Sequence, residues 1–369
     1  MSTTRKPRAV FQPDVVVVGG GLIGLTCATA LAREGVRILV VSSTEPGAAS
    51  PASAGILAPT VGGAPPPVRA LGIAARDMYP PYVEELVART GIPVSLDLSG
   101  VLEMVRDDVQ ATALRASLHR QTEWVEPHLL PALEPAVRPA AGAAFHARDG
   151  AVDARALLEA VQADARRDPR ISLVGGRVVR LEVDRVPTIL GLQSGERVEA
   201  DKVVIAAGAW VGAIWGLPRP IPVVPVRGQI LALGGETPRH VVMGADGYIV
   251  PRGSRCLAGS TMEHVGFDAR TTAKGAARIR EITAALMPSL AERPELEHWA
   301  GLRPVTPDLL PIVGVDPEHD RLFYACGHSK NGVLLAPLTA HVIADLIARG
   351  STSVDATPYA PGRFQDKGR

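Results

Sequence analysis

Three glycines near the start of the chain have a spacing that suits the binding of a pyrophosphate. Gly19, Gly21 and Gly24 fit the pattern G-x-G-x-x-G and stand between an apolar β-branched run, 15–18, and a run of helix-forming residues. At such a junction the glycines allow a tight turn, close approach of the backbone to a pyrophosphate, and close helix–strand packing. The first N–H groups of the new helix face the same anion. The segment therefore predicts a dinucleotide site.

The acidic residue that usually holds the ribose is absent. A second apolar strand, 38–41, completes the βαβ unit, and the acid is expected about 20 residues after the glycines. Ser42 and Ser43 stand there instead. We expect Ser42, Ser43 or the nearby Glu45 to contact the ribose less strongly than an acid in the usual place. Because that acid would repel a 2′-phosphate, its absence leaves a nicotinamide-dependent reductase open, although no Arg follows Val41.

An arginine near the C-terminus carries the second chemical signal. Arg303 lies in an otherwise apolar block made of Trp299, Ala300, Leu302, Pro304 and Val305. A buried guanidinium needs an anionic partner, and its planar fork matches a carboxylate at two points. Asp308 can be that partner within the protein, or a substrate carboxylate can. Tyr248 can add a hydroxyl to the same carboxylate or be an ordinary strand aromatic, and Met262 can line the pocket or simply fill space.

Composition and charge exclude several classes of protein. A length of 369 residues suggests two interwoven or consecutive domains, and a hydrophobic fraction of 46% allows a substantial core. Lys plus Arg is 39 and Asp plus Glu is 38, which leaves no basic excess for a nucleic acid. The cysteines and histidines lack ligand spacing, so we predict no metal site and no disulfide framework.

The same observations favour a cytoplasmic protein. The basic residues and apolar run at the N-terminus resemble a secretory signal only loosely, because cleavage there would destroy the βαβ unit. The run is also too short and too rich in glycine for a membrane span, so we expect no stable membrane insertion. Cysteines without a disulfide framework suit a reducing compartment.

Hydrophobic periodicity predicts the elements that position these residues. Helices are expected over 69–90 with a break at Pro80 and Pro81, after the capping residue Asp153, over 272–287 and over 333–347. Strands are expected at 171–174, 178–183, 202–206 and 322–325, with antiparallel strands over 222–261. Loops are expected over 50–68 and the Pro-rich stretch 127–139, and tails over 1–13 and 357–369.

The nucleotide-binding pieces are spread along the chain. The segment 202–206 has the composition of a buried parallel strand, which we expect to return to the sheet begun at 15–18. This spread suits a fold in which two segments are inserted into one cofactor domain. It does not suit a compact NAD domain followed by a catalytic domain.

Nine sequence blocks, spread over nearly the whole length of the chain, carry a resemblance to a known family. They are DVVVVGGGLIGL, ASAGILAP, DGAVDARALLEA, VVIAAGAW, PVRGQIL, YIVPR, GSTMEHVGFD, WAGLRPVTPDLLPIVG and GHSKNGVLLAP. With these blocks the chain resembles the D-amino acid oxidase superfamily of FAD-dependent amine oxidoreductases, and most closely the bacterial glycine oxidases of the thiamine pathway. The last blocks are the most specific, because a generic Rossmann protein has no reason to contain them.

The resemblance implies an α/β fold. A Rossmann-like FAD-binding domain (14–78, 150–215 and 300–350) is interleaved with an α+β substrate domain (79–149 and 216–299) that contains an antiparallel sheet. The FAD is expected to be non-covalent, because no cysteine lies between Cys256 and Cys326, where similar sarcosine oxidases attach their flavin.

The resemblance also implies the site residues. Cofactor contacts are expected from Gly19, Gly21, Leu22, Ile23, Gly24, Ser42, Ser43, Ser53, Ala54, Gly55, Leu57, Val178, Gly208, Trp210, Gly327, Lys330, Asn331, Gly332 and Val333, with Arg227, Gly228 and Gln229 near the flavin ring. Arg303 and Tyr248 are the expected catalytic residues, and Met262 and Lys330 are expected in the substrate pocket. Lys330 stands where glycine oxidases commonly have Arg, and Val305 replaces a common Gly.

The implied reaction is the oxidative deamination of glycine or another small amino acid. Its products are the oxo acid (glyoxylate from glycine), ammonia and hydrogen peroxide, and the glycine imine would supply thiazole synthesis in thiamine biosynthesis. The alternative is an FAD-dependent D-amino acid dehydrogenase that uses a respiratory-chain acceptor. A flavin-binding protein without catalysis is a further alternative, which the intact Arg303 and Tyr248 disfavour. The expected partners are the amino acid, molecular oxygen and further copies of the chain in a homo-oligomer, a tetramer by resemblance.

Overall fold

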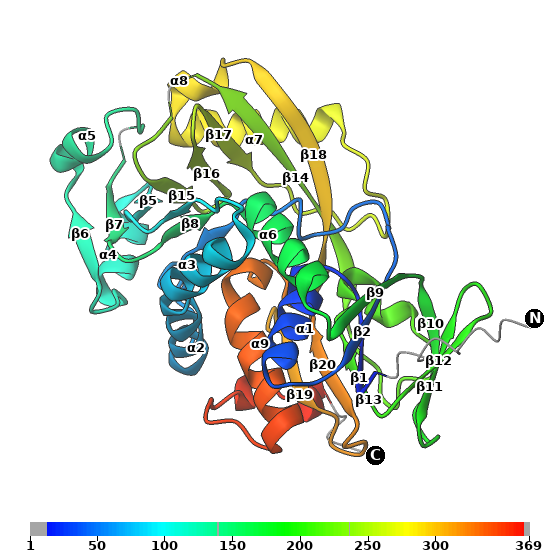
Figure 1. Ribbon diagram of the computed structural model, residues 1–369. Coiled ribbons are helices and arrows are strands. Elements are labelled where there is room, and N and C mark those ends of the chain that lie inside the picture. The colour runs from blue at the N-terminus through cyan, green and yellow to red at the C-terminus, as the bar shows by residue number, and fades with distance from the viewer. Residues whose placement is uncertain (1–12, 139, 236, 365–369) are drawn as a thin grey trace, which may run out of the picture.

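The computed structural model describes residues 13–138, 140–235 and 237–364. Two large sheets organise these residues (Figure 1). A six-stranded, mostly parallel sheet lies below an eight-stranded, mostly antiparallel sheet in this view. Apart from residue 13, the predicted lead-in 1–13 lies outside the described residues.

The six-stranded sheet takes its strands from three distant parts of the chain. Its order is β19 (Ile312–Val315), β20 (Leu322–Cys326), β13 (Lys202–Ile205), β1 (Val15–Val18), β2 (Ile38–Ser42) and β9 (Ile171–Gly175). β1 pairs in parallel with both β2 and β13, so the predicted return of this later segment to the first strand is confirmed. β19 pairs antiparallel with β20 at the edge.

Alternate residues of β1 face two different cores, because successive side chains of a strand point to opposite faces. Val15 and Val17 pack under the helices, and Val16 and Val18 pack against a small antiparallel sheet. The helices are α1 (Leu22–Arg33), α2 (Pro66–Asp77), α3 (Tyr79–Thr90), α6 (Ala154–Arg167) and α9 (Gly332–Arg349). The small sheet contains β10 (Val178–Glu182), β11 (Thr188–Leu192) and β12 (Arg197–Ala200).

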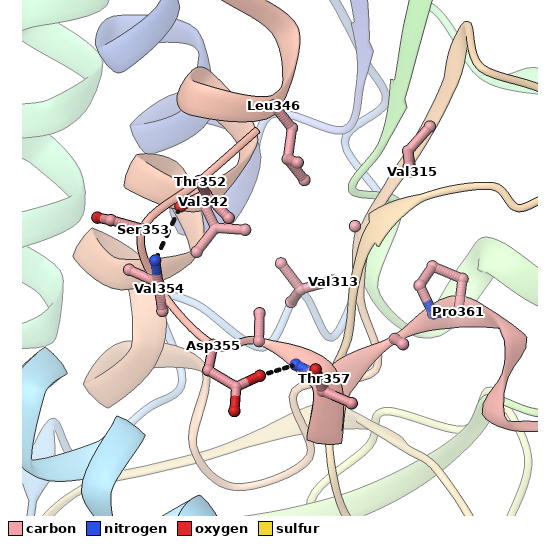
Figure 2. A pocket seen from close by; sticks show the side chains of 13 residues that line it. Val313, Val315, Val342, Leu346, Thr352, Ser353, Val354, Asp355, Thr357 and Pro361 are labelled. Atoms are coloured by element: carbon pink, nitrogen blue, oxygen red, sulfur yellow. Dashed lines mark hydrogen bonds between the residues drawn. The ribbon is translucent and has the colours of Figure 1, made fainter. Parts of the chain in front are cut away.

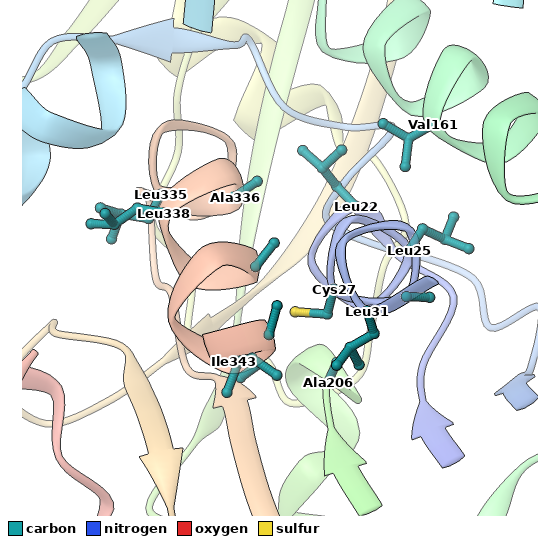
Figure 3. Close-up of a cluster of buried hydrophobic side chains, with 14 of the residues drawn as sticks. Leu22, Leu25, Cys27, Leu31, Val161, Ala206, Leu335, Ala336, Leu338 and Ile343 are labelled. Carbon is teal, nitrogen blue, oxygen red and sulfur yellow. The ribbon is translucent and has the colours of Figure 1, made fainter. Parts of the chain in front are cut away.

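Helix α9 is apolar because it lies in the core. Figure 3 shows Ala336 of α9 turned toward Leu22 of α1, and the Cys27 sulfur of α1 turned toward α9. The helix is long and apolar enough to cross a membrane by length and composition, but 72% of its apolar window is buried inside the protein. Its hydrophobicity is thus explained by packing against α1 and the sheet.

The eight-stranded sheet forms the second part of the molecule. Its order is β18 (Glu295–Val305), β14 (Val224–Gly234), β17 (Arg255–Gly259), β16 (Gly247–Arg252), β15 (Val241–Gly244), β5 (Val101–Val105), β7 (Gly142–His146) and β6 (Thr122–Val125). The antiparallel strands predicted within 222–261 are confirmed as β14 to β17. Helix α7 (Ala273–Leu286), capped by Thr272, packs on this sheet together with α8 (Pro288–Ala291).

Short elements complete the described chain. A third sheet contains β3 (Ile56–Leu57), β8 (Gly150–Val152) and β4 (Leu96–Asp97). The remaining elements are α4 (Asp108–Ala116), α5 (Leu130–Leu133) and the 3₁₀ turns η1 (Pro127–Leu129), η2 (Gly208–Ala213), η3 (Thr357–Tyr359) and η4 (Pro361–Phe364).

Several predicted bounds differ from the structure. Pro80 and Pro81 open α3 instead of interrupting a helix, because the first turn of a helix tolerates proline. The predicted loop 50–68 contains β3 and the start of α2, and the Pro-rich stretch 127–139 contains η1 and α5.

Two predicted domain boundaries do not coincide with changes in packing. Helix α3, expected in the substrate domain, places Tyr79, Val83 and Leu86 in the core with α1 and α6. Strand β18 runs through the predicted boundary at 299/300 as one element of the large sheet.

The expected loose tail over 357–369 is wrong for 357–364. Tyr359 is only 4% exposed, and Arg363 Nε donates a hydrogen bond of 2.8 Å to Asp308 Oδ2. The tail is held by these long-range contacts, which a local composition rich in polar residues and proline does not reveal. Residues 365–369 lie outside the described part of the chain.

Candidate active site

The glycine loop between β1 and α1 has the geometry that a pyrophosphate needs. Gly19 has φ +115°, and a Cβ there would overlap the carbonyl oxygen of Ala206, so only glycine fits. A Cβ on Gly24 would overlap the carbonyl oxygen of Gly19. A Cβ on Gly21, by contrast, would make one close contact, with the side-chain hydroxyl of Ser50 at 3.1 Å, and would overlap no backbone atom. The tight turn at Gly19 and the close packing at Gly24 are therefore present, and the approach of a pyrophosphate to Gly21 stays a prediction.

The N-terminus of α1 lies at Gly21. Gly21 is the N-cap residue and offers no side chain to the first N–H groups. Leu22 N–H donates to the Ser50 hydroxyl at 3.0 Å. Leu22 is buried and Ile23 half-buried, so their backbone is the part that can meet an anion.

The residues expected to contact the ribose lie where β2 ends. A Cβ on Gly20 would lie 2.7 Å from the Ser42 hydroxyl, which places this hydroxyl directly against the glycine loop. Ser43 is exposed, whereas the Glu45 carboxylate pairs with Arg177 at 3.4 Å. Of the three residues considered for the ribose, Ser42 therefore lies closest to the loop, and Glu45 has another partner.

The loop 53–57 ends in β3 of the third sheet and also contacts β16 of the eight-stranded sheet. Gly55 has φ +77°, and its carbonyl oxygen accepts a hydrogen bond of 2.9 Å from the Val152 N–H. Arg252, at the end of β16, donates to the carbonyl oxygen of Ala54 at 2.9 Å. Ser53 accepts from Gly55 N–H at 3.1 Å, and Leu57 is fully buried. These contacts fix the loop on both sides.

A second helix N-terminus lies beside β18. Ser329 N–H donates to the carbonyl oxygen of Pro304 at 2.9 Å, which brings the start of α9 next to the residue after Arg303. Asn331 is the N-cap of α9, with Gly332 and Val333 in its first turn and Gly327 at φ +68° before it. Lys330 is exposed at this end of the helix.

Three further predicted cofactor contacts lie in the turn η2 and in strand β10. Gly208 (φ +55°) begins η2, and Trp210 in the same turn stacks on Phe267 with ring centroids 5.9 Å apart. Val178 is 6% exposed in β10, at the far side of β2. Their relation to a bound cofactor stays a prediction.

Arg303 does not pair with Asp308. Asp308 instead pairs with Arg363, and this pair holds the pKa of the Asp308 carboxyl below its ordinary value although burial acts to raise it. The Arg303 guanidinium is half-buried and donates from Nη1 to the carbonyl oxygen of Thr261 at 3.0 Å and from Nη2 to the Ser260 hydroxyl at 2.7 Å. Among the described residues it has no carboxylate partner.

Tyr248 lies on the same side of the sheet as the guanidinium. Burial raises the pKa of Tyr248, and the charge of Arg303 and hydrogen bonds with Ser260 and Arg303 partly oppose this rise. The phenol is therefore protonated at neutral pH and can donate a hydrogen bond. Met262 is 60% exposed, with Sδ 3.7 Å from Arg303 Nη1.

The polar residues after β17 were not predicted as site residues. Ser260 and Thr261 hold the Arg303 guanidinium, and Glu263 binds Arg227 Nη2 at 2.5 Å and Gln229 Nε2 at 2.6 Å. Burial acts to raise the pKa of Glu263, but hydrogen bonds from Arg227, Thr261 and Gln229 lower it below its ordinary value. The sequence signals for these residues were the block GSTMEHVGFD, which the resemblance includes, and its polar side chains directly after an apolar strand.

A hollow elsewhere on the molecule contains none of the predicted site residues. It has a volume of about 520 Å³ and lies between β19, the end of α9 and residues 352–361 (Figure 2). Its lining is mostly apolar, and its hydrogen bonds join Val354 N–H to the Thr352 hydroxyl and Thr357 N–H to Asp355. The chemistry-bearing side chains are therefore outside this hollow.

The fold and the glycine loop define a Rossmann-type dinucleotide-binding protein with a second, antiparallel sheet over the nucleotide site. Residues 14–346 match the family model described as "FAD dependent oxidoreductase" (DAO). The chain belongs to this family, and its cofactor is FAD.

Similar proteins cover nearly the whole chain. A glycine oxidase of Pseudomonas aeruginosa is 34% identical over 94% of this chain and 98% of its own length. The crystal structure of glycine oxidase from Geobacillus kaustophilus superposes with a TM-score of 0.89 at 31% identity, covering 96% of this chain and 100% of the other. The bifunctional protein ThiO/ThiG of Trichormus variabilis is 31% identical over 95% of this chain, which spans 55% of that protein.

Proposed function

We propose that this FAD-dependent enzyme oxidises glycine or another small amino acid. Water and molecular oxygen are the other substrates, and the products are the oxo acid, ammonia and hydrogen peroxide. The relatives named as glycine oxidases support this assignment. The bifunctional relative supports a further step in the proposal, which is supply of the glycine imine for thiazole formation in thiamine biosynthesis.

The observation that carries the proposal is the unpaired charge of Arg303. Its guanidinium is held by a backbone carbonyl and a hydroxyl, so the cation lacks a protein carboxylate among the described residues. A substrate carboxylate can neutralise it and use its remaining N–H groups at two points. Such a charge-assisted interaction contributes roughly 1.5–3 kcal/mol per hydrogen bond. An amino acid is thereby favoured over a neutral amine.

Tyr248 completes the carboxylate site in this proposal. Its protonated hydroxyl lies beside Arg303 and can donate to the second carboxylate oxygen. With the carboxylate held, rotation about the bond to Cα is the main freedom left to the amino acid, and positioning of this kind contributes much of enzymatic rate. Met262 and Lys330 are proposed to border the pocket.

The glycine loop, the loop 53–57 and the start of α9 are proposed to hold FAD. When bound, FAD accepts the two electrons and the hydrogen lost from the substrate's Cα. The protein holds the amino acid in position for this transfer and excludes competing reactions. His328 is not a base in this proposal, because burial lowers its pKa to about 3 and its Nε2 faces the Thr339 hydroxyl at 3.0 Å.

A substrate screen on the holoenzyme tests this function. Glycine, sarcosine and small D- and L-amino acids are supplied in air without another electron acceptor, and hydrogen peroxide and ammonia are measured. We expect equal amounts of both products from glycine or a close analogue. Turnover only with an added quinone or dye, without peroxide, would contradict the oxidase.

Two further parts of the proposal concern the state of the protein. We propose a cytoplasmic location, which suits three buried free thiols, and a homo-oligomer. Sedimentation of the purified holoenzyme tests the second point, with a monomer as the contradicting result.

A further inference from the structure

Arg303 reaches its partners by crossing a neighbouring strand. It lies on β18, which pairs with β14, and β14 pairs on its other side with β17. Ser260 and Thr261 follow β17, so the guanidinium must pass over β14 to reach them. The backbone of 261–263 continues alongside β14, with Arg227 N–H donating to Glu263 O at 2.9 Å and Glu263 N–H to Arg227 O at 3.0 Å.

The crossing takes place over Gly228. An ideally placed Cβ on this glycine would overlap Nη1, Cζ and Nη2 of Arg303 at once. The neighbours Arg227 and Gln229 point to the opposite face, where both bind Glu263. The backbone of Gly228 has no positive φ that would require glycine. Space for the guanidinium is therefore the physical reason for glycine at this position.

We propose that Gly228 is a positioning residue that sets where the Arg303 guanidinium binds the substrate carboxylate. The missing side chain lets the planar guanidinium lie on β14, bound to Ser260 and Thr261, with its remaining N–H groups available to the ligand. This inference rests on the proposed role of Arg303 and names the residue that determines its position.

A methyl group at position 228 displaces only the end of a flexible side chain. The overlapping atoms all belong to the guanidinium, and no backbone atom is among the nearest neighbours. Gly228→Ala is therefore expected to fold, to keep its stability and to bind FAD. The displaced guanidinium loses its hydrogen bonds to Ser260 and Thr261 and meets the carboxylate in the wrong place.

Gly234 provides a matched control on the same strand. A Cβ at this position would contact Leu296 at 3.4 Å, an ordinary van der Waals distance. Gly234→Ala makes the same chemical change in β14 without touching Arg303.

The test is a titration of the holoenzyme with acetate, a carboxylate without an amine, followed by the change in flavin absorbance. Wild type, Gly228→Ala, Gly234→Ala and Arg303→Ala are compared, together with the KM for glycine and the thermal unfolding midpoint. We expect the acetate Kd and the KM to rise about tenfold or more in Gly228→Ala, the loss of roughly one charge-assisted hydrogen bond. Gly234→Ala should match wild type, and the unfolding midpoints should agree.

The outcomes separate the two claims. If Arg303→Ala binds acetate as tightly as wild type, the carboxylate role of Arg303 fails, and this inference fails with it. If Arg303→Ala loses acetate binding but Gly228→Ala retains it, only the role of Gly228 is overturned. A lower unfolding midpoint or loss of FAD in Gly228→Ala, with unchanged acetate affinity in the remaining holoenzyme, would assign the glycine a purely structural role.

Discussion

Asp308 and Arg363 form a two-point ion pair, with Nε–Oδ2 at 2.8 Å and Nη2–Oδ1 at 3.2 Å. This pair occupies the acidic residue that lies nearest to Arg303 along the chain. It leaves the Arg303 cation available to a ligand, and it fastens the segment 357–364 to the turn after β18. One ion pair therefore supports both the proposed substrate site and the position of the C-terminal segment.

Removal of this pair should affect stability and leave substrate binding nearly unchanged. Because its carboxylate is part exposed, we expect Arg363→Ala to lower the free energy of unfolding by about 1 kcal/mol. The pKa of Asp308 lies below its ordinary value of 3.8 in the folded protein, so the pair stabilises above that pH and loses its effect as the pH falls further. Denaturant unfolding at neutral and acidic pH should show that acid lowers the free energy of unfolding less in Arg363→Ala than in wild type. A large rise in the KM for glycine would contradict the separation of the two arginines.

Ser42→Glu should strengthen FAD binding. The Ser42 hydroxyl lies against Gly20 at the edge of the glycine loop, where a carboxylate can accept from the ribose hydroxyls. We expect the Kd of FAD for the apoprotein to fall about tenfold, as one charge-assisted hydrogen bond allows. Ser43→Glu adds the same charge one residue further, at an exposed position, and serves as control. An unchanged Kd in Ser42→Glu would remove Ser42 from the ribose site.

Glu263→Gln should weaken both the fold and the substrate site. Arg227 is 4% exposed and loses its nearest counter-charge, which leaves Asp268 at 3.2 Å as its remaining acidic partner. An uncompensated buried cation costs roughly 3 kcal/mol or more, and the remaining partner should reduce this loss to about 2 kcal/mol. The KM for glycine should rise, because Glu263 also fixes Thr261, whose carbonyl oxygen holds Arg303.

The ion pair between Arg227 and Glu263 also predicts that stability depends on pH. The folded pKa of Glu263 lies below its ordinary value of 4.5, so its stabilisation is present above that pH and is lost as the pH falls through the folded value. The free energies of unfolding of wild type and Glu263→Gln should therefore become equal in acid. Asp268→Asn, which keeps Glu263, is the milder control, and an equal loss in both variants would contradict the leading role of Glu263.

Local patterns were sufficient to predict the Rossmann half of the fold. The apolar runs of β1, β2 and β13 and the glycine spacing each specify an element without help from distant residues. Strands β5, β6 and β7 were missed, because their short runs gain stability from pairing with one another and with β15. Propensity carries little information about such pairing.

Some features of the candidate site could likewise be predicted from the sequence, and others could not. Arg303 and Tyr248 could be singled out because a charge or a hydroxyl in an apolar strand needs a partner. The partner of Asp308 is 55 residues away along the chain, and Gly228 is even further from Arg303, the residue that crosses over it. These relations depend on strand register, which the sequence pattern alone does not specify.

Discrimination between glycine and glycinamide by wild type and Arg303→Ala tests the central claim most directly. The two substrates differ in the carboxylate, and Arg185→Ala, at an exposed arginine in the turn between β10 and β11, is the matched control. We predict that wild type and the control strongly prefer glycine in kcat/KM, and that Arg303→Ala keeps its yellow FAD but loses about a hundredfold or more of this preference. An unchanged preference in Arg303→Ala would show that another group recognises the carboxylate and would contradict the account.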